Sequence, residues 1–251
     1  MKELTTAIDL NSPERFHEIR STLEKKASLR SLYLEVYQKY AACIARSPLE
    51  GLALEIGSGA GFVKDIIPQI ITSDVVSYPK VDRVMDATHL DFPDNSLSCI
   101  CMFNVLHHIP NTPAFFKEAI RCLVPGGRVF MLEPYAGWIS SWVFRYLHHE
   151  DFDKNVEAWE FRSKGPVSDA NNALPSIIFE RDLEKFHKEF PELSIVRFEP
   201  QMPLRYWLTG GLQKWTVLPQ WAYGLSCWLD KKLIQISPRL GSFVDIELVK
   251  S

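Results

Sequence analysis

Residues 52–62, with the sequence LALEIGSGAGF, constrain the fold of this chain more than any other segment. An apolar run leads into glycines at every second position from 57 to 61, and one carboxylate, Glu55, stands two residues before the first of them. A glycine-rich turn after a strand lets a ligand approach the backbone closely at the mouth of an α/β sheet. Glu55 would repel a pyrophosphate and attract a cationic group such as an ammonium. The segment therefore predicts a first strand that ends in a site for a cationic ligand.

Short apolar runs recur along the chain and alternate with helical stretches. They span residues 52–57, 69–75, 83–87, 97–106 and 127–134, and residues 194–200 and 242–250 have the same character. The segment TPAFFKEAIRCLVPGG between two of these runs reads as a helix that a Pro-Gly-Gly sequence ends. Strands that alternate with helices form a parallel sheet with helices on both faces. The chain is therefore predicted to be an α/β protein with a mostly parallel, seven-stranded sheet.

The regions on either side of the first five runs differ in character. Residues 1–48 are predicted to form an N-terminal helical arm, because residues 13–46 repeat apolar side chains at helical spacing. Residues 49–134 form the half that holds the glycine turn, and every tryptophan lies beyond it. Residues 135–251 are therefore predicted to form an aromatic-rich C-terminal cap and the last strands of the same domain, with a helix over residues 177–190.

Charge and cysteine content narrow the classes of function. The 28 Lys and Arg residues against 31 Asp and Glu residues give a net charge of −3 without a dense basic run, which argues against a nucleic acid as the main partner. Five scattered cysteines predict buried, reduced thiols and favour a cytoplasmic location. No run of about 18 apolar residues occurs and the N-terminal segment lacks an apolar signal-peptide core, so no transmembrane segment is expected.

Residues 50–134 resemble the class I S-adenosylmethionine-dependent methyltransferases. The first motif of that family reads E-x-G-x-G-x-G, and Asp74 and Asp86 lie near the ends of the second and third runs, where the family has acidic residues. The segments FNVLHHIPN and CLVPGGRVFMLEP resemble its later motifs. The resemblance implies a Rossmann-like small-molecule methyltransferase domain with S-adenosylmethionine as cofactor. The cofactor-binding residues that it implies are Glu55, Gly57, Ser58, Gly59, Gly61, Asp74, Asp86, Ala87 and Asn104.

The chemistry of this cofactor matches three of these side chains. S-adenosylmethionine carries an ammonium, a vicinal diol and an aminopurine. Glu55 suits the ammonium, and the resemblance assigns Asp74 to the ribose hydroxyls and Asp86 to the amino group of the adenine. A nicotinamide-dependent oxidoreductase is disfavoured by Glu55 and by a glycine spacing that differs from G-x-G-x-x-G.

Two histidines follow the fourth run, where the reacting groups of open α/β sheets gather. Methyl transfer is an in-line displacement, which needs a base only when the acceptor must lose a proton. His107 or His108 is predicted to be that base, with a structural role at the strand end as the alternative. Some related enzymes bind a metal through E-x-x-E-H, where this chain has Asn104-x-x-His107-His108. No metal is therefore expected, although His148, His149, Glu150 and Asp153 could join them as ligands if the cap folds over the mouth of the sheet.

The cap is predicted to select the acceptor. Its aromatic and amide side chains could stack on a ring and fix its hydroxyls, or the aromatic residues could simply form the core of the cap. The predicted substrate-binding residues are Tyr135, His148, His149, Asn171, Asn172, Tyr206 and Trp207. Beyond Pro219, an apolar helical stripe that includes Trp221, Leu225 and Trp228 could rest on a membrane surface, but packing against the sheet is expected.

The sequence as a whole favours a cytoplasmic enzyme that moves a methyl group from S-adenosylmethionine to a small or lipid-linked acceptor. A sugar or another hydroxyl compound would suit the cap. The alternative is a non-catalytic protein that binds the cofactor and serves as a partner subunit. The oligomeric state has no signature in the sequence.

Overall fold

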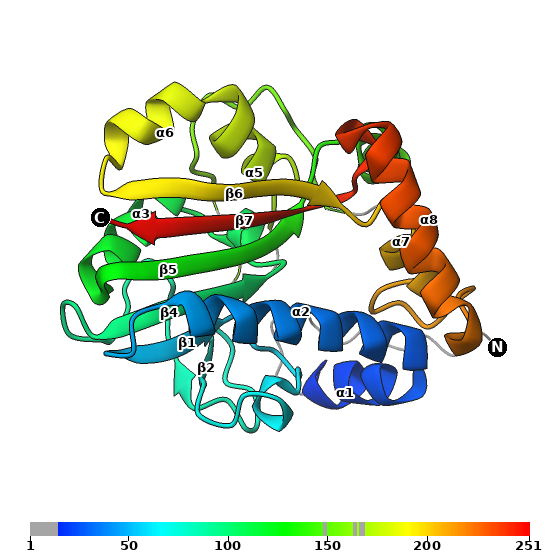
Figure 1. The fold of residues 1–251 in the computed structure, drawn as a ribbon, viewed down its shortest axis with the longest axis horizontal. Helices are drawn as coiled ribbons and strands as arrows, with labels where there is room; N and C mark the ends of the chain where they lie inside the picture. The colour runs from blue at the N-terminus through cyan, green and yellow to red at the C-terminus, as the bar shows by residue number, and fades with distance from the viewer. Residues whose placement is uncertain (1–14, 148–149, 163–164, 166–168) are drawn as a thin grey trace.

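The computed structural model describes residues 15–147, 150–162, 165 and 169–251. Its centre is a seven-stranded sheet with the strand order β3-β2-β1-β4-β5-β7-β6 (Figure 1). The strands are β1 (Leu52–Ile56), β2 (Ile71–Asp74), β3 (Arg83–Val84), β4 (Leu97–Phe103), β5 (Leu123–Pro134), β6 (Leu193–Gln201) and β7 (Phe243–Lys250). The first five strands are parallel, and β7 runs antiparallel to both β5 and β6. The predicted α/β, mostly parallel and Rossmann-like sheet is confirmed.

Alternation along the central strands explains why helices cover both faces. In β4, Ile100 and Met102 face one core, while Cys99 and Cys101 face the other. Successive side chains of a strand point to opposite faces, so a strand buried on both sides reads as a continuous apolar run. Helices α3 (Thr112–Cys122) and α6 (Leu183–Glu189) pack on the first face, and α2 (Ala27–Arg46) packs on the second.

The N-terminal arm is two helices where one was expected. Helix α1 (Arg15–Lys25) and α2 are separated at Lys26, whose backbone leaves the helical region. The Lys26 side chain is buried, and its Nζ donates to the carbonyls of Gly211 and Gln213 at 2.7 and 3.0 Å. The break therefore turns the lysine side chain inward, where two carbonyls of the cap accept hydrogen bonds from its ammonium group.

The expected helices between the first strands are absent. In residues 57–96, all of which the structure describes, the only helical element is a 3-10 turn at Val63–Asp65. Pro68 and Pro79 divide this segment, and each lacks the backbone N–H that a continuing helix needs. Helix α2 covers this part of the sheet instead, because its side chains share a core with Phe62, Val63 and Ile67.

The helix expected over residues 177–190 is divided into two pieces, and a short helix precedes them. Helix α5 (Leu174–Ser176) continues into a π-helical turn (Ile177–Arg181), and α6 follows. At the junction, Asp182 donates its N–H to the carbonyl of Ile177 and accepts a hydrogen bond from the indole of buried Trp159 at 2.8 Å. The wider turn thus brings a carboxylate to a buried polar group that needs a partner.

The cap elements lie beyond the carboxyl ends of the parallel strands (Figure 1). They are α4 (Trp138–Tyr146), α7 (Arg205–Thr209) and α8 (Tyr223–Ile236). The expectation that the apolar stripe of α8 packs against the sheet is wrong, because Leu225 and Trp228 are each 55% exposed. Asp230 is turned inward instead and accepts hydrogen bonds from the backbone of Leu204 and from the guanidinium of Arg205. No helix among the described residues is long and apolar enough to cross a membrane.

Candidate active site

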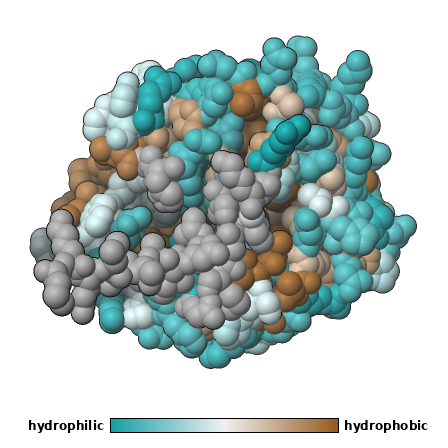
Figure 2. Space-filling model, turned by 180° about the vertical axis from the view of Figure 1, so that it is seen from behind, coloured by the Kyte–Doolittle hydropathy of each residue, from teal (hydrophilic) through white to brown (hydrophobic). Residues whose placement is uncertain are grey.

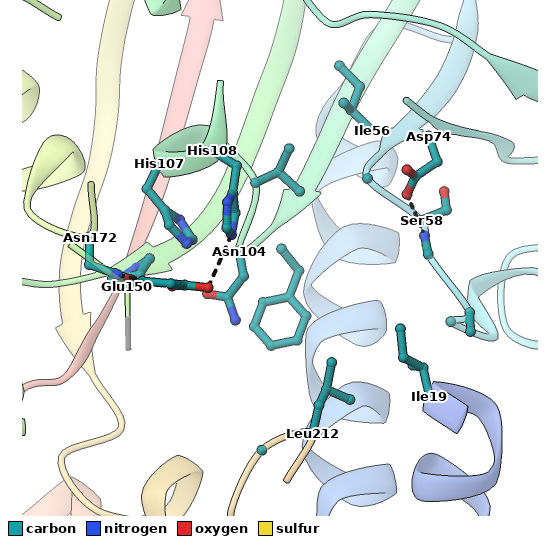
Figure 3. A pocket seen from close by; sticks show the side chains of 18 of the residues that line it. Ile19, Ile56, Ser58, Asp74, Asn104, His107, His108, Glu150, Asn172 and Leu212 are labelled. Carbon is teal, nitrogen blue, oxygen red and sulfur yellow. Dashed lines mark hydrogen bonds and ion pairs between the residues drawn. The ribbon is translucent and has the colours of Figure 1, made fainter. Parts of the chain in front are cut away.

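A cavity of about 1070 Å³ lies at the carboxyl ends of the parallel strands, enclosed by the sheet, α1, α2 and the cap (Figure 3). It brings together most of the residues predicted from the sequence. Those that line it are Glu55, Gly57, Ser58, Gly59, Gly61, Asp74, Asp86, Ala87, Asn104, His107, His108, Asn172, Tyr206 and Trp207. The cofactor residues and the histidines therefore share one continuous space with part of the cap.

The glycine turn follows β1 in a conformation that side chains would obstruct. Gly57 has a φ of +72°, and a Cβ there would lie 2.4 Å from Cγ2 of Val105. A Cβ at Gly61 would lie 2.5 Å from the hydroxyl of Tyr37. The turn is joined to β2, because the N–H of Ser58 donates to the carbonyl of Ser73. The glycines thus keep the backbone open and close to the cavity.

Glu55 is a buried carboxyl group in the wall of the cavity. Its Oε2 has no hydrogen-bond partner within the part of the chain that the structure describes. Burial raises the pKa of Glu55 to about 7, and the nearby Asp74 carboxylate acts in the same direction. A buried carboxyl with one unsatisfied oxygen in this position fits a cationic group, whose charge would compensate the cost of burial.

The two aspartates differ in their surroundings. Asp74, at the end of β2, is buried and accepts hydrogen bonds from the N–H groups of Gly59 and Val76 at 2.9 Å. These bonds fix the orientation of its carboxylate toward the turn. Asp86 is exposed, and its Oδ1 accepts hydrogen bonds from the backbone N–H and the hydroxyl of Thr88. Both aspartates keep acceptor capacity for a ligand in the cavity.

Asn104 follows β4 in a strained conformation. Its φ is +57°, in the left-handed region that few residues other than glycine adopt. Its Oδ1 is buried and lacks a hydrogen-bond partner among the described residues, while its N–H donates to the carbonyl of Leu132. Strain and an unsatisfied amide oxygen together at a cavity wall are typical of a ligand-binding position.

His107 is oriented by a buried carboxylate that sequence reasoning did not single out. The residue lies on the 3-10 turn Leu106–His108, and its Nδ1 is 2.7 Å from Oε2 of Glu133. The other carboxylate oxygen of Glu133 accepts from the N–H groups of Val105 and Leu106. With Nδ1 donating to Glu133, Nε2 of His107 is left as an acceptor on the cavity side. Glu133 therefore fixes the orientation of the His107 ring.

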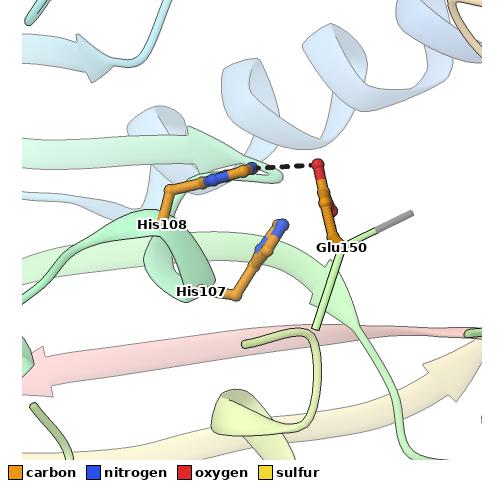
Figure 4. A group of neighbouring side chains, drawn as sticks. All are labelled: His107, His108 and Glu150. Carbon is orange, nitrogen blue, oxygen red and sulfur yellow. Dashed lines mark ion pairs between the residues drawn. The ribbon is translucent and has the colours of Figure 1, made fainter. Parts of the chain in front are cut away.

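His108 stands in a different environment. Its Nδ1 is 3.1 Å from the carbonyl of Asp169, and its Nε2 is 3.8 Å from Oε1 of Glu150 (Figure 4). Asn172 donates to the other oxygen of Glu150 at 3.0 Å. Burial and the neighbouring His107 lower the pKa of His108 to about 4, so the ring is neutral near pH 7.

The two imidazoles and the carboxylate of Glu150 converge on one another (Figure 4). One potential ligand atom from each lies within 4.8 Å of the others, a spacing that could accommodate a divalent cation. Asp153, named above as a possible ligand, accepts from the N–H of Asn155 and does not line the cavity. Among the described residues, the ligand set open to a metal is thus His107, His108 and Glu150, while His148 and His149 lie outside the residues that the structure describes.

Several residues predicted to bind the acceptor have other surroundings. Tyr135 does not line the cavity, and its hydroxyl donates to Glu180 at 3.1 Å. Asn171 also lies outside the lining, because its amide group bonds to the backbone of Asp153. His148 and His149 fall outside the described residues. Tyr206 and Trp207 do line the cavity, and the indole of Trp207 donates to the hydroxyl of Ser242.

Comparisons with known proteins agree with this geometry. A family model described as a methyltransferase domain matches residues 54–131. A Mycolicibacterium smegmatis protein named "Probable S-adenosylmethionine-dependent methyltransferase" is 33% identical over 108 residues, which cover 39% of this chain and 41% of that relative. The match thus spans less than half the length of the relative.

A solved structure shares the fold over most of the chain. It is the complex between the Haloferax volcanii Trm112 methyltransferase activator and a proposed methyltransferase, with a TM-score of 0.50 and 13% identity. The likeness covers 92% of this chain and 97% of the other. The glycine turn, the ordered acids and these matches lead to one conclusion: the chain contains a class I S-adenosylmethionine-dependent methyltransferase domain, and the cofactor of that domain is S-adenosylmethionine.

Proposed function

We propose that this protein transfers the methyl group of S-adenosylmethionine to a hydroxyl of a small or lipid-linked acceptor. The observation that carries the proposal is a single cavity with two distinct ends. Glu55, a buried carboxyl whose Oε2 has no partner among the described residues, lies at the end formed by the glycine turn. The His107–Glu133 pair lies at the end formed by β4, β5 and the cap.

The cofactor would bind along the glycine turn, where it supplies an activated methyl carbon. Glu55 would pair with its ammonium, and the backbone of the turn would contact its amino-acid portion. The Asp74 carboxylate, held by the N–H of Gly59, would accept from the ribose hydroxyls. Asp86 would accept from the amino group of the adenine, and buried Ala87 would contact the ring.

His107 would remove the proton of the acceptor. As the acceptor oxygen bonds to the methyl carbon and the sulfur–carbon bond breaks, the hydroxyl proton moves to Nε2 of His107. Glu133 holds Nδ1 of the ring, so it would stabilise the imidazolium that forms. His108 would be a poor proton acceptor near pH 7, because burial lowers its pKa to about 4.

The cap would hold the acceptor beside His107. Tyr206 and Trp207 present aromatic surface to the cavity, and Asn172 presents an amide beside Glu150. Aromatic faces stack on sugar or other rings, while amide and carboxylate groups fix hydroxyls. A sugar or another hydroxyl compound therefore fits this end better than a purely apolar acceptor.

A cytoplasmic location would suit the thiols. Sγ of Cys99 lies 3.7 Å from Sγ of both Cys43 and Cys101, and all three are buried without a disulfide. A hydrogen bond to a neighbouring thiol raises the pKa of Cys43 and of Cys99, and burial raises the pKa of all three thiols, which keeps them protonated and unreactive. A reducing compartment preserves such a cluster.

The proposal is tested by transfer of a radiolabelled methyl group. The protein is incubated with labelled S-adenosylmethionine and a cell extract that has been divided into water-soluble and chloroform-soluble fractions. Label is expected in a hydroxyl compound of one fraction, and calorimetry is expected to show binding of S-adenosylhomocysteine. Binding without any transfer would favour the non-catalytic alternative, and tight NADH binding with no response to S-adenosylhomocysteine would contradict both.

A further inference from the structure

Most tryptophans of the chain are on its surface. The five whose side chains are more than half exposed are Trp138, Trp142, Trp215, Trp221 and Trp228. Of the other two, Trp159 is buried and Trp207 lines the cavity. A large aromatic side chain loses favourable burial when it is left in water, so five of them on one protein indicate a surface that something covers.

These tryptophans belong to one part of the molecule. Helices α4 and α8 both contact the 3-10 turn Pro238–Leu240, and the loop 212–217 joins α7 to the segment that begins α8. Brown, apolar side chains gather on the left of Figure 2, which is the side of α8 once the molecule is turned. We call this surface the tryptophan face; its exposed members are Trp138, Trp142, Tyr146, Leu147, Leu212, Trp215, Val217, Trp221, Leu225, Trp228, Leu229 and Ile236.

In the two chain segments that form this face, the exposed charges are positive. Between residues 203 and 241 the only acidic residue is Asp230, which is buried against Arg205. The exposed ionisable side chains of the same segment are Lys214, Lys231, Lys232 and Arg239, and α4 adds Arg145 without an acid. The whole chain carries a net charge of −3, so the positive charge of this segment is opposite in sign to that of the chain as a whole. Tryptophan with lysine and arginine is the composition of surfaces that lie at the boundary of anionic membranes.

The tryptophan face also reaches the mouth of the cavity. Leu147, Leu212 and Trp215 are exposed members of the face and at the same time line the cavity. An acceptor whose tail stayed in a lipid layer could thus place its head group in the cavity along an apolar path. A water-soluble acceptor would not need apolar side chains at the mouth of the cavity.

We infer that the tryptophan face docks on an anionic membrane surface and that the acceptor is the head group of a lipid anchored in that membrane. A second copy of the chain is a poorer occupant, because a symmetric pair would bring like charges together. The delivery of the acceptor rests on the proposed transfer reaction, whereas docking itself does not.

Docking is tested with vesicles and the full chain, without cofactor or acceptor. Vesicles of phosphatidylcholine alone are compared with vesicles that contain one third phosphatidylglycerol, by co-sedimentation and by the emission of the exposed tryptophans. Wild-type protein is expected to bind the anionic vesicles at least tenfold more tightly, with a blue shift in emission, and to be released as salt concentration rises.

Substitutions at two exposed leucines distinguish docking of this face from a general effect of added negative charge. Leu225→Glu adds a negative charge on the tryptophan face, and Leu49→Glu adds one to an exposed leucine before β1, at the opposite end of that strand from the cavity. Leu225→Glu is expected to weaken vesicle binding about tenfold or more, and Leu49→Glu less than twofold. Both should bind S-adenosylhomocysteine normally.

Three results would overturn the inference. They are equal loss of vesicle binding in both variants, no binding by the wild type, and a dimer in light scattering that Leu225→Glu dissociates. If the wild type does not bind vesicles but binds S-adenosylhomocysteine, the docking inference is wrong and the proposed function is not contradicted. If vesicles are bound but S-adenosylhomocysteine is not, the proposed function fails and docking stands.

Discussion

At the scale of single residues, the site depends on groups whose burial changes their chemistry. Glu55 is the clearest case, because burial raises its pKa to about 7 and its Oε2 has no partner among the described residues. His107 is the second, since a fully buried carboxylate fixes its ring. Each supports a quantitative prediction about binding or turnover.

The affinity for S-adenosylhomocysteine is expected to depend on pH through Glu55. Its pKa in the free protein is raised to about 7, so below that pH the carboxyl holds a proton that the ammonium of the ligand must displace. Binding is therefore strong above pH 7 and weakens as pH falls, by nearly tenfold per unit between pH 6 and 5. Calorimetry at pH 5, 6, 7 and 8 measures it.

Glu55→Gln should flatten this pH dependence and weaken binding at pH 8 about tenfold or more, because the ion pair is lost. The control is Glu192→Gln, which changes an exposed glutamate outside the cavity. A Glu55→Gln variant that keeps the wild-type pH profile would exclude Glu55 as the partner of the ammonium.

Replacement of His107, the proposed base, is expected to slow turnover. His107→Asn should lower kcat by about a hundredfold or more while binding of S-adenosylhomocysteine stays near normal, as general-base catalysis usually contributes that much. His89→Asn is the control, because His89 is exposed and does not line the cavity. Unchanged kcat in His107→Asn would mean that alignment alone drives the transfer.

The same assay with a chelator separates a base from a metal ligand. Turnover is expected to persist, in keeping with a direct proton transfer to His107. Loss of turnover that a divalent ion restores would instead make His107, His108 and Glu150 the ligands of a metal, as their spacing would permit.

How far these residues could be predicted depended on their sequence context. The E-x-G-x-G-x-G turn and the acids after it are local signals, and all nine predicted cofactor-binding residues line the cavity. Glu133 is 26 positions from His107, and nothing in a single sequence pairs two such distant residues. A buried acid in the apolar strand FMLEP was the only available signal. Tyr135 and Asn171 were assigned by residue type alone, and both bond elsewhere.

At the scale of elements, the strands were easier to predict than the helices. A strand buried on both faces is a short apolar run whatever its partners, so β1, β4 and β7 lie close to their predicted ranges. Helix boundaries depended on distant contacts. The helix breaks at Lys26, where the side chain reaches the carbonyl of Gly211. The apolar stripe of α8 faces outward because Asp230 on the same helix faces inward and accepts from Leu204.

The break between α1 and α2 is expected to organise the cap. Lys26→Met keeps the apolar stem but removes the two hydrogen bonds to Gly211 and Gln213, which leaves their carbonyls without this donor. The free energy of unfolding should fall by about 1–3 kcal/mol, and KM for the acceptor should rise while cofactor affinity stays the same. Lys25→Met, at the exposed neighbouring position, is the control for urea denaturation and kinetics. An equal effect in both variants would contradict the prediction that the buried hydrogen bonds of Lys26 organise the cap.

At the scale of the whole molecule, the cavity, the helical layers and the sheet are each formed by residues that are far apart in sequence. The cavity joins α1, the first strands and the cap, and α2 covers a face of the sheet where helices between the strands were expected. The division of the chain into an arm, a cofactor-binding half and a cap stays a prediction, although α2 packs as one layer of the domain. The last strand in sequence, β7, lies between β5 and β6 and pairs with both.

Deletion of residues 243–251 is expected to prevent folding of the remaining chain. Without β7, the edges of β5 and β6 would present unpaired backbone groups beside a large apolar core, which favours aggregation. Sedimentation of the truncated protein after expression measures this, and a deletion of Ser251 alone should sediment as the wild type does. A soluble, monomeric truncated protein would show that β7 is dispensable.

The position of β7 also sets an order of events during synthesis. The ribosome synthesises β6 some forty residues before β7, so for that interval the sheet has a gap that no other strand in the described part of the chain is placed to fill. The nascent protein would remain open, exposed to chaperones and unable to close its cavity. Methyl transfer would therefore begin only after the strand nearest the end of this sequence has left the ribosome.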